Sequence, residues 1–259
     1  MIRIKTPDEI EKMRIAGGVV ARTLDHLARS IVPGKTTTQD LTALAEHLLA
    51  QAGAAASFKG YRGYPSAICA SVNQVVVHGI PGPLPLDTGD IVGIDLGAIV
   101  EGYHGDAAVT VPVGEISEEA GRLLRVTREA LYKGIEQARP GRRVGDIGAA
   151  IQEYAERHGY SVVRDLVGHG IGRSMHEDPQ VPNFGKHGHG PRLREGMTLA
   201  IEPMVNIGGY STRTLDDHWT IVTKDGSLSA HFEHTVAITA RGPDILTVGP
   251  DRGGISANG

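Results

Sequence analysis

Apolar residues recur every three or four positions along the first part of the chain and predict two helices. Thr6, Pro7 and Glu9 form a helix start, with a threonine cap, a proline in the first turn and a glutamate that completes a capping box. The apolar face that follows consists of Ile10, Met13, Gly17, Val20, Leu24 and Leu27. After a break at 33–35, leucines with the same spacing predict a second helix over 38–52.

Short apolar runs without this period predict buried strands. The runs 90–94 and 109–113 would form a hairpin that carries Asp95 and Asp106. A carboxylate within a buried strand is costly unless it is paired or binds a metal. Adjacent strands would direct both carboxylates at one point, and the alternative is that the two aspartates cap turns at strand ends. Further strands are predicted over 68–72, 74–78, 160–163, 196–202, 220–223 and 232–239.

The second half of the chain begins again with two helices, over 117–138 and 144–159, and repeats features of the first half. Pro33-Gly34 recurs as Pro140-Gly141 and Ile94-Asp95 as Ile201-Glu202, both 107 residues later. His78-Gly79-Ile80 also recurs, 91 residues later, at His169-Gly170-Ile171. The repeat predicts two α/β halves that face each other, with a site between them.

The composition is that of a water-soluble globular protein. The chain has 259 residues, of which 40% are hydrophobic and 22% charged. Its net charge of −4 without a long basic run predicts neither nucleic-acid nor anionic-membrane binding, so we expect no such partner. Its one cysteine, Cys69, cannot form an internal disulfide. With no signal sequence and no long apolar run, we expect a cytoplasmic protein. The Gly/Ser/Asn-rich tail 249–259 is expected to be disordered.

Seven polar residues at the ends of predicted strands are candidates for a functional site. They are His78, Asp95, Asp106, His169, His176, Glu202 and Glu233. Four carboxylates at one place would repel each other strongly, and a pair of divalent cations would relieve the repulsion. Mainly oxygen ligands with one histidine favour Mn(II), Fe(II), Co(II) or Zn(II) over a structural zinc site.

Each candidate also has an ordinary structural interpretation. His78 and His169 lie among glycines and apolar residues, as buried histidines often do. His176 would lie in a solvated loop, Glu202 would end a strand before a proline, and Glu233 would be a surface residue.

Seven segments in order resemble those of type I methionine aminopeptidases. They are 77–81, 94–97, 102–108, 168–172, 176–179, 198–204 and 229–235, and the similarity runs from about Thr6 to Val248. The resemblance implies a mixed α/β (α+β) pita-bread fold, in which antiparallel strands and outer helices form two pseudo-symmetric halves around a dinuclear metal site. We therefore expect a single catalytic domain over 1–248, with halves at about 6–115 and 116–248.

The resemblance also implies a role for each candidate. The ligands of two divalent ions would be Asp95, Asp106, His169, Glu202 and Glu233, with Asp106 and Glu233 bridging both ions. Glu202 would act as general base toward a water activated by the metals. His78 and His176 would contact the substrate without binding metal.

An apolar pocket for the methionine side chain is implied as well. Tyr61, Tyr64, Cys69, Met175 and Trp219 match its positions, although each is also an ordinary core residue type. Met175 stands where many members of the family carry an aromatic residue, which affects the shape of the pocket but not the reaction.

The expected activity is removal of the initiator methionine from nascent proteins, with a small second residue favoured. The expected partner is the nascent N-terminus, with the ribosome as a further candidate partner, and the expected state is a monomer. Two alternatives share the fold: an aminopeptidase or dipeptidase that cleaves X-Pro bonds, and a non-catalytic homologue that only binds.

Overall fold

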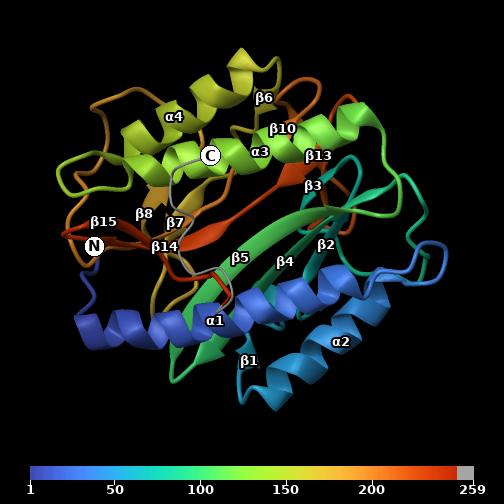
Figure 1. Ribbon diagram of the computed structural model, residues 1–259, viewed down its shortest axis with the longest axis horizontal. Coiled ribbons are helices and arrows are strands. Elements are labelled where there is room, and N and C mark those ends of the chain that lie inside the picture. Colours follow the sequence, from blue (N-terminus) through green and yellow to red (C-terminus); the bar gives the residue numbers. More distant parts are fainter. Residues whose placement is uncertain (250–259) are drawn as a thin grey trace.

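The computed structural model describes residues 1–249, and its α-helices form two pairs. They are α1 (Pro7–Arg29), α2 (Thr38–Gln51), α3 (Glu118–Gln137) and α4 (Val144–Arg157). Figure 1 shows α1 and α2 on one side of the strands and α3 and α4 on the other. The predicted start of α1 is confirmed. The Thr6 hydroxyl accepts a hydrogen bond from the Glu9 backbone N–H, and the Glu9 carboxylate accepts one from the Thr6 backbone N–H. The tail predicted to be disordered lies, apart from Gly249, outside the described residues.

The two aspartates lie on one long hairpin. Strands β4 (Ile91–Val100) and β5 (Tyr103–Pro112) pair along their whole length, and a turn at Glu101-Gly102 with positive φ at both residues connects them. Both strands extend further than the apolar runs predicted. Asp95 and Asp106 therefore lie within strands, and the interpretation that they cap turns at strand ends is wrong.

The remaining strands complete a set of antiparallel sheets. They are β1 (Ala55–Ala56), β2 (Cys69–Val72), β3 (Val75–Val77), β6 (Ser161–Val162), β7 (Gly168–Gly170), β8 (Glu177–Val181), β9 (Thr198–Ile201), β10 (Met204–Asn206), β11 (Thr212–Thr214), β12 (Ile221–Thr223), β13 (Ser229–His231), β14 (His234–Thr239) and β15 (Gly242–Ile245). One sheet has the order β1-β4-β2 with β5 beside β4, and another has the order β15-β14-β9-β7-β8. Two smaller sheets have the orders β13-β10-β6 and β11-β12-β3. The strand predicted over 232–239 begins only at His234, so that Glu233 lies between β13 and β14.

Each helix pair covers the sheet of its own half. Leu24 of α1 and Leu41 of α2 belong to the same buried cluster as Ile94 of β4. Leu123 of α3 and Leu199 of β9 belong to a second, larger cluster. Within residues 1–249, no helix combines the length and the apolar character needed to cross a membrane.

The pairing of the strands defines which residues of the two halves correspond. In the first half Gly93 pairs with Ser71 and Thr110, and in the second half Ala200 pairs with His169 and Thr235. Gly93 and Ala200 are 107 residues apart, which is the interval predicted from the sequence and also the one between Asp95 and Glu202.

The match of His78 with His169, 91 residues apart, is not part of this correspondence. The counterpart of His169 is Ser71, which precedes it by 98 residues. His78 precedes His176 by the same 98 residues. The prediction paired His78 with His169 because both precede Gly-Ile, and this recurrence is a coincidence. The strand pairing instead relates His169 to Ser71.

Two threonines join the halves at the centre of the molecule. The Thr235 hydroxyl donates to the Asp106 carbonyl at 2.8 Å and accepts the Asp106 N–H at 3.0 Å. The Thr110 hydroxyl donates to the His231 carbonyl at 2.8 Å and accepts the His231 N–H at 2.9 Å. Each threonine satisfies both backbone groups of a buried residue in the other half. Because both pairs are related by the same interval of 125 residues, His231 is the counterpart of Asp106.

Helix α1 lies directly against the strand that carries Asp106. A Cβ atom on Gly105 would be 2.6 Å from the backbone nitrogen of Gly17 in α1, and one on Gly17 would be 2.3 Å from the Leu246 carbonyl oxygen. Such distances leave no space for a side chain at either glycine. The backbone of α1 therefore fixes the position of β5 next to the site.

We expect Thr235→Val to destabilise the protein. Valine keeps the shape of the side chain but leaves the Asp106 N–H and C=O buried without partners, which is expected to lower the free energy of unfolding by about 2–4 kcal/mol. Urea unfolding measures the change. Thr235→Ser keeps the hydroxyl and removes one methyl group, so it should cost less than about 1.5 kcal/mol. Equal losses in the two variants would show that the hydroxyl does not hold the halves together.

Candidate metal and active site

Carboxylates from both halves meet where the two sheets face each other. Ligand atoms of Asp106, His169 and Glu233 all lie within 4.8 Å of one another. Glu202 is next to them, with Oε1 at 3.5 Å from His169 Nε2. Asp95 is close enough to Asp106 and Glu202 for their charges to raise the pKa of its carboxyl group. The structure thus brings together all five residues that the sequence offered as metal ligands.

Burial and mutual repulsion disfavour the ionised form of each of these acids. Asp106 and Glu233 are only 4% and 2% exposed. Burial raises the pKa of Asp106 to about 7, and burial together with the neighbouring charges raises the pKa values of Asp95, Glu202 and Glu233 well above their usual range. No lysine or arginine forms an ion pair with any of the four among residues 1–249.

The hydrogen-bonding pattern of the acids fits a cation site. Asp95 Oδ1, Asp106 Oδ1 and Glu233 Oε1 are fully buried, and none of them has a hydrogen-bond partner in the described part of the chain. Buried polar atoms without partners are rare and call for an explanation. A divalent cation bound by these oxygens would supply both the missing interactions and the missing positive charge.

The orientation of His169 fits the same site. Its Nδ1 is 2.9 Å from the Gly170 carbonyl, which can only accept, so Nδ1 carries the proton and Nε2 presents a lone pair. That lone pair faces a carboxylate oxygen of Glu202, an arrangement of two acceptors that a metal ion between them would stabilise. A hydrogen bond at the second ring nitrogen is the usual way in which proteins orient a histidine ligand.

His231 is a site residue that the sequence analysis did not single out. It is buried, its Nε2 has no hydrogen-bond partner among the described residues, and this atom is 3.7 Å from Glu202 Oε2. Burial lowers the pKa of His231 to about 3, so the ring is neutral at pH 7. The interval of 125 residues from Asp106 could have identified it, but only after the strand register was known.

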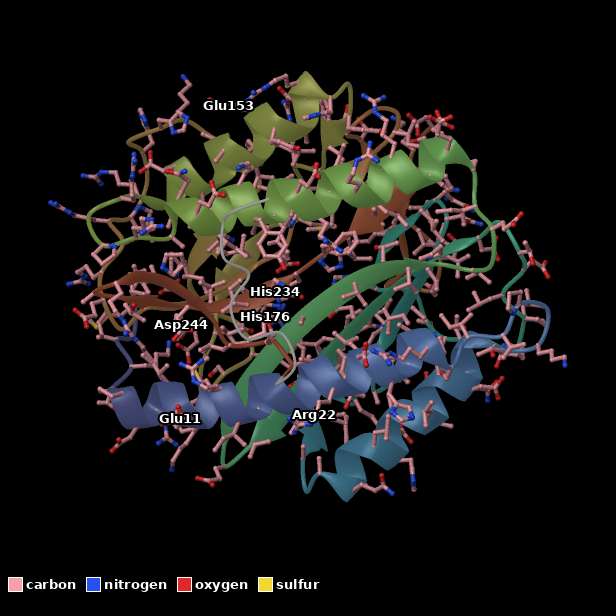
Figure 2. All side chains as sticks on the ribbon, in the orientation of Figure 1. Glu11, Arg22, Glu153, His176, His234 and Asp244 are labelled. Carbon is pink, nitrogen blue, oxygen red and sulfur yellow. The ribbon has the colours of Figure 1, made fainter. Side chains whose placement is uncertain are left out.

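His78 and His176 lie at the same site without joining the acid cluster. The His176 ring is 4.2 Å from that of His169, and its Nδ1 is 2.9 Å from the Tyr61 hydroxyl. Figure 2 shows His176 near the centre of the molecule, between the two helix pairs. His78 follows β3 with φ at 58°, in the left-handed region that non-glycine residues seldom adopt. Burial lowers the pKa of His78 to about 4 and also lowers that of His176, so both are neutral at pH 7.

The residues predicted to form an apolar pocket pack together beside these histidines. One cluster contains Phe58, Tyr64, Cys69 and Met175, with Tyr61 and Trp219 packed against it. The Tyr64 and Trp219 rings meet edge to face at 5.1 Å, and the Tyr61 ring stacks on His176 at 5.3 Å. These residues therefore form one apolar cluster, which contacts His176 through Tyr61 and His78 through Trp219.

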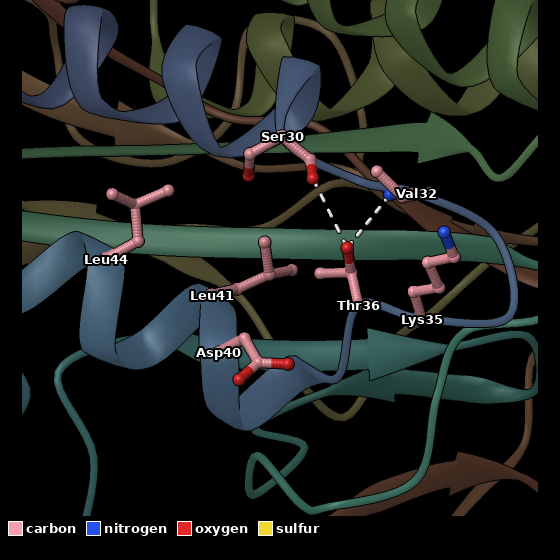
Figure 3. Close-up of a pocket in the computed structure, with 7 residues that line it drawn as sticks. All are labelled: Ser30, Val32, Lys35, Thr36, Asp40, Leu41 and Leu44. Atoms are coloured by element: carbon pink, nitrogen blue, oxygen red, sulfur yellow. Dashed lines mark hydrogen bonds between the residues drawn. The ribbon is translucent and has the colours of Figure 1, made fainter.

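A separate cavity of about 260 Å³ lies between the end of α1 and the start of α2 (Figure 3). Its lining residues are Ser30, Val32, Lys35, Thr36, Asp40, Leu41 and Leu44. The Thr36 hydroxyl accepts a hydrogen bond from the Val32 N–H and donates one to the Ser30 carbonyl, so these three groups already have partners. None of the predicted site residues lines this cavity.

Comparisons with known proteins find similar proteins over nearly the whole chain. A model of metallopeptidase family M24 matches residues 11–240. A methionine aminopeptidase of Clostridium perfringens is 55% identical over 248 residues, which cover 96% of this chain and 99% of that protein. The crystal structure of a methionine aminopeptidase from Thermotoga maritima superposes with a TM-score of 0.94 at 52% identity, covering 96% of this chain and all of that one.

More distant structures share only the fold. An Xaa-Pro dipeptidase from Bacillus anthracis matches with a TM-score of 0.76 at 24% identity, and the match covers 95% of this chain but 62% of that one. Together, these matches confirm the pita-bread architecture with antiparallel sheets and two pseudo-symmetric halves.

The raised pKa of Asp106 predicts a pH-dependent stability for the metal-free protein. The folded state binds this proton with a pKa of about 7, against an ordinary value of 3.8. The contribution of Asp106 to the free energy of unfolding is thus complete below about pH 4 and is lost as the pH rises to about 7. Urea unfolding at a series of pH values measures the loss, which Asp106→Asn is expected to reduce.

Two controls accompany this measurement. Asp8→Asn, on the exposed first turn of α1, removes one negative charge elsewhere and should leave the pH dependence unchanged. Saturating Mn(II) should abolish the loss, because the metal binds the ionised carboxylates. The same pH dependence in wild type and Asp106→Asn would contradict the assignment.

Proposed function

This chain belongs to metallopeptidase family M24, and from that membership we propose that it removes the initiator methionine from new proteins, with a small second residue favoured. The observation that carries the proposal is 55% identity to a methionine aminopeptidase over nearly the whole of both chains. The cluster of Asp106, His169 and Glu233 supports the metal dependence of the reaction.

The proposed ligands of two divalent ions are Asp95, Asp106, His169, Glu202 and Glu233, with Asp106 and Glu233 shared between the ions. Bound there, Co(II), Mn(II), Fe(II) or Zn(II) would polarise the peptide carbonyl and make a water easier to deprotonate. Asp95 is the acid beside which the free α-amine of the substrate would lie. A blocked N-terminus would therefore bind poorly.

Glu202 is the proposed general base. Its side chain is 16% exposed, whereas Asp106 and Glu233 are only 4% and 2% exposed, so that a water and the scissile amide can reach it. Bound metal ions would favour the ionised carboxylate, which could take a proton from water and then pass it to the leaving amine.

His176 and His78 are proposed to bind the reacting peptide group. If the Tyr61 hydroxyl donates to Nδ1 of the neutral His176 ring, then Nε2 carries the proton and can donate to the substrate carbonyl oxygen. Negative charge grows on that oxygen in the transition state, so this hydrogen bond strengthens as the reaction proceeds. Tyr61 would thus orient the catalytic histidine as well as border the methionine pocket.

The apolar cluster of Phe58, Tyr64, Cys69 and Met175 is the proposed binding site for the methionine side chain, closed at its border by Tyr61 and Trp219. The flexible thioether packs well against aromatic rings and a second thioether. The proposal further includes a monomer in the cytoplasm that acts on nascent N-termini, with the ribosome as a candidate partner.

An X-Pro peptidase is the second candidate function, and the observations favour it less. The Xaa-Pro dipeptidase named above shares 24% identity, and this chain spans 62% of its length. A non-catalytic homologue is disfavoured because all five proposed ligands and both histidines are present and lie together.

The first test measures release of free methionine from Met-Ala-Ser and Met-Leu-Ser by metal-stripped protein, with Co(II), Mn(II), Fe(II) or Zn(II) added back. We expect metal-dependent release from the first peptide and much slower release from the second. Cleavage of X-Pro peptides with poor cleavage of Met-Ala-Ser would favour the second candidate function. No release from any peptide by folded protein would favour the non-catalytic homologue.

The second test concerns His176. We expect His176→Ala to lower kcat by about 10²–10³-fold, the usual effect of removing one donor to a developing oxyanion. Metal content, measured by atomic emission, should stay at the wild-type value because His176 is not a proposed ligand. His189→Ala, on an exposed loop outside the site, is the matched control. Turnover of His176→Ala at the wild-type rate would remove His176 from the mechanism.

A further inference from the structure

A groove of about 540 Å³ begins at the proposed active site and runs over the surface of the second half. His169 and His176 line it, so its inner end is the catalytic centre itself. Gln180 of the edge strand β8 also lines it, as do Arg3 of the N-terminal segment and Arg62 of the turn next to Tyr61. The groove is thus separate from the apolar cluster proposed for the methionine side chain.

The wall of the groove formed by the N-terminal segment is firmly attached. Lys5 Nζ is 2.7 Å from Glu177 Oε2, and both side chains are about 5% exposed. The Lys5 backbone N–H donates to the Gly196 carbonyl at 2.7 Å. A buried ion pair holds this segment against β8. The backbone of Arg3, two residues before Lys5, is therefore held beside the groove.

Arg62 is held on a similarly fixed turn. Its own backbone lies in the left-handed region, with φ at 49°, between Gly60 and Gly63, which also have positive φ. The guanidinium lies over the Tyr61 ring at 5.4 Å, and Tyr61 in turn contacts His176. Arg62 therefore stays beside the reacting end of the groove.

The charges of the groove leave a positive excess. Its two acids already have partners, Glu177 with Lys5 and Asp178 with the Met1 amine. Arg3 and Arg62 are exposed, and neither forms an ion pair with any residue in the described range 1–249. An anionic group in the groove would meet two unpaired guanidinium groups, whereas a cationic group would meet repulsion.

We propose that this groove binds the substrate chain beyond its second residue and favours acidic side chains at the third to fifth positions. The inference rests on the proposed function, because it needs a peptide whose first bond lies at the metal site. An extended peptide advances about 3.3 Å per residue, so the three residues after the second would span about 10 Å of a groove that Arg62 and Arg3 line. Selectivity thus extends beyond the methionine and its small neighbour.

The test compares kcat/KM for three peptides, Met-Ala-Ser-Asp-Asp, Met-Ala-Ser-Ser-Ser and Met-Ala-Ser-Lys-Lys, each with an amidated C-terminus. We expect the aspartate peptide to exceed the lysine peptide by about three- to tenfold at low salt, as two exposed charge pairs would produce. High salt should reduce the ratio toward one, because it screens exposed charges.

Charge-reversed variants locate the preference. Arg62→Glu and Arg3→Glu should each reduce the aspartate-to-lysine ratio, and the double variant should invert it. Arg128→Glu, on the exposed face of α3, makes the same change of charge outside the groove and should keep the wild-type ratio. Circular dichroism checks the fold of each variant, and fluorescence anisotropy of labelled Ala-Ser-Asp-Asp and Ala-Ser-Lys-Lys measures groove binding without turnover.

The outcomes separate this inference from the proposed function. Equal kcat/KM for the three peptides, with normal methionine release, would overturn the groove inference and leave the proposed function intact. A ratio that changes equally in Arg62→Glu and Arg128→Glu would overturn it as well, since net charge alone would then explain the preference. No methionine release from any peptide would instead overturn the proposed function.

Discussion

Four carboxylates lie together between the two halves, and the rest of the architecture has to hold them there. Asp95, Asp106, Glu202 and Glu233 repel each other and lose hydration, which is why their pKa values rise. A structure that left them free to move would let them separate into water. The hydroxyls of Thr110 and Thr235, and the Glu233 N–H that donates to the Ala108 carbonyl at 2.9 Å, instead tie the strands of one half to those of the other. Metal binding would then be strong because the repulsive arrangement exists before the metal arrives.

The same constraint explains the close packing around β5. Gly17 and Gly105 bring the backbone of α1 against the strand, so that β5 cannot yield on its outer side when the acids repel on its inner side. The proposed substrate site is built differently from the acid cluster. Tyr61 contacts His176 and Trp219 contacts Tyr64, so aromatic rings rather than backbone define the pocket. Backbone contacts therefore support the strand that carries charge, whereas side chains line the proposed substrate site.

Much of this arrangement could be predicted from local sequence signals. The capping box at Thr6 and the leucines of α1 define that helix without reference to the rest of the fold. The interval of 107 residues between Asp95 and Glu202 equals that between Pro33-Gly34 and Pro140-Gly141. This equality predicted two corresponding halves. The extent of β4 and β5 could not be predicted, since Asp95 and Gly97 interrupt the apolar pattern after the first run and polar residues precede the second, and only the pairing of the strands extends the hairpin. His231 was missed for a related reason, because its counterpart Asp106 has a different side chain and only the sheet register relates the two.

The hydrogen bonds of the two threonines are consistent with an origin of the chain by duplication of a shorter one. Thr110 and Thr235 make the same two bonds from corresponding positions, as expected if a half-length ancestral unit was duplicated and joined end to end. At the positions beside them the copies have diverged: Asp106 corresponds to His231, and Ser71 to His169. A homodimer of the ancestral unit would have presented two identical sets of side chains across its axis. Joining the copies in one chain would free each set to change separately, which would leave the bonds that hold the halves duplicated and the chemistry asymmetric.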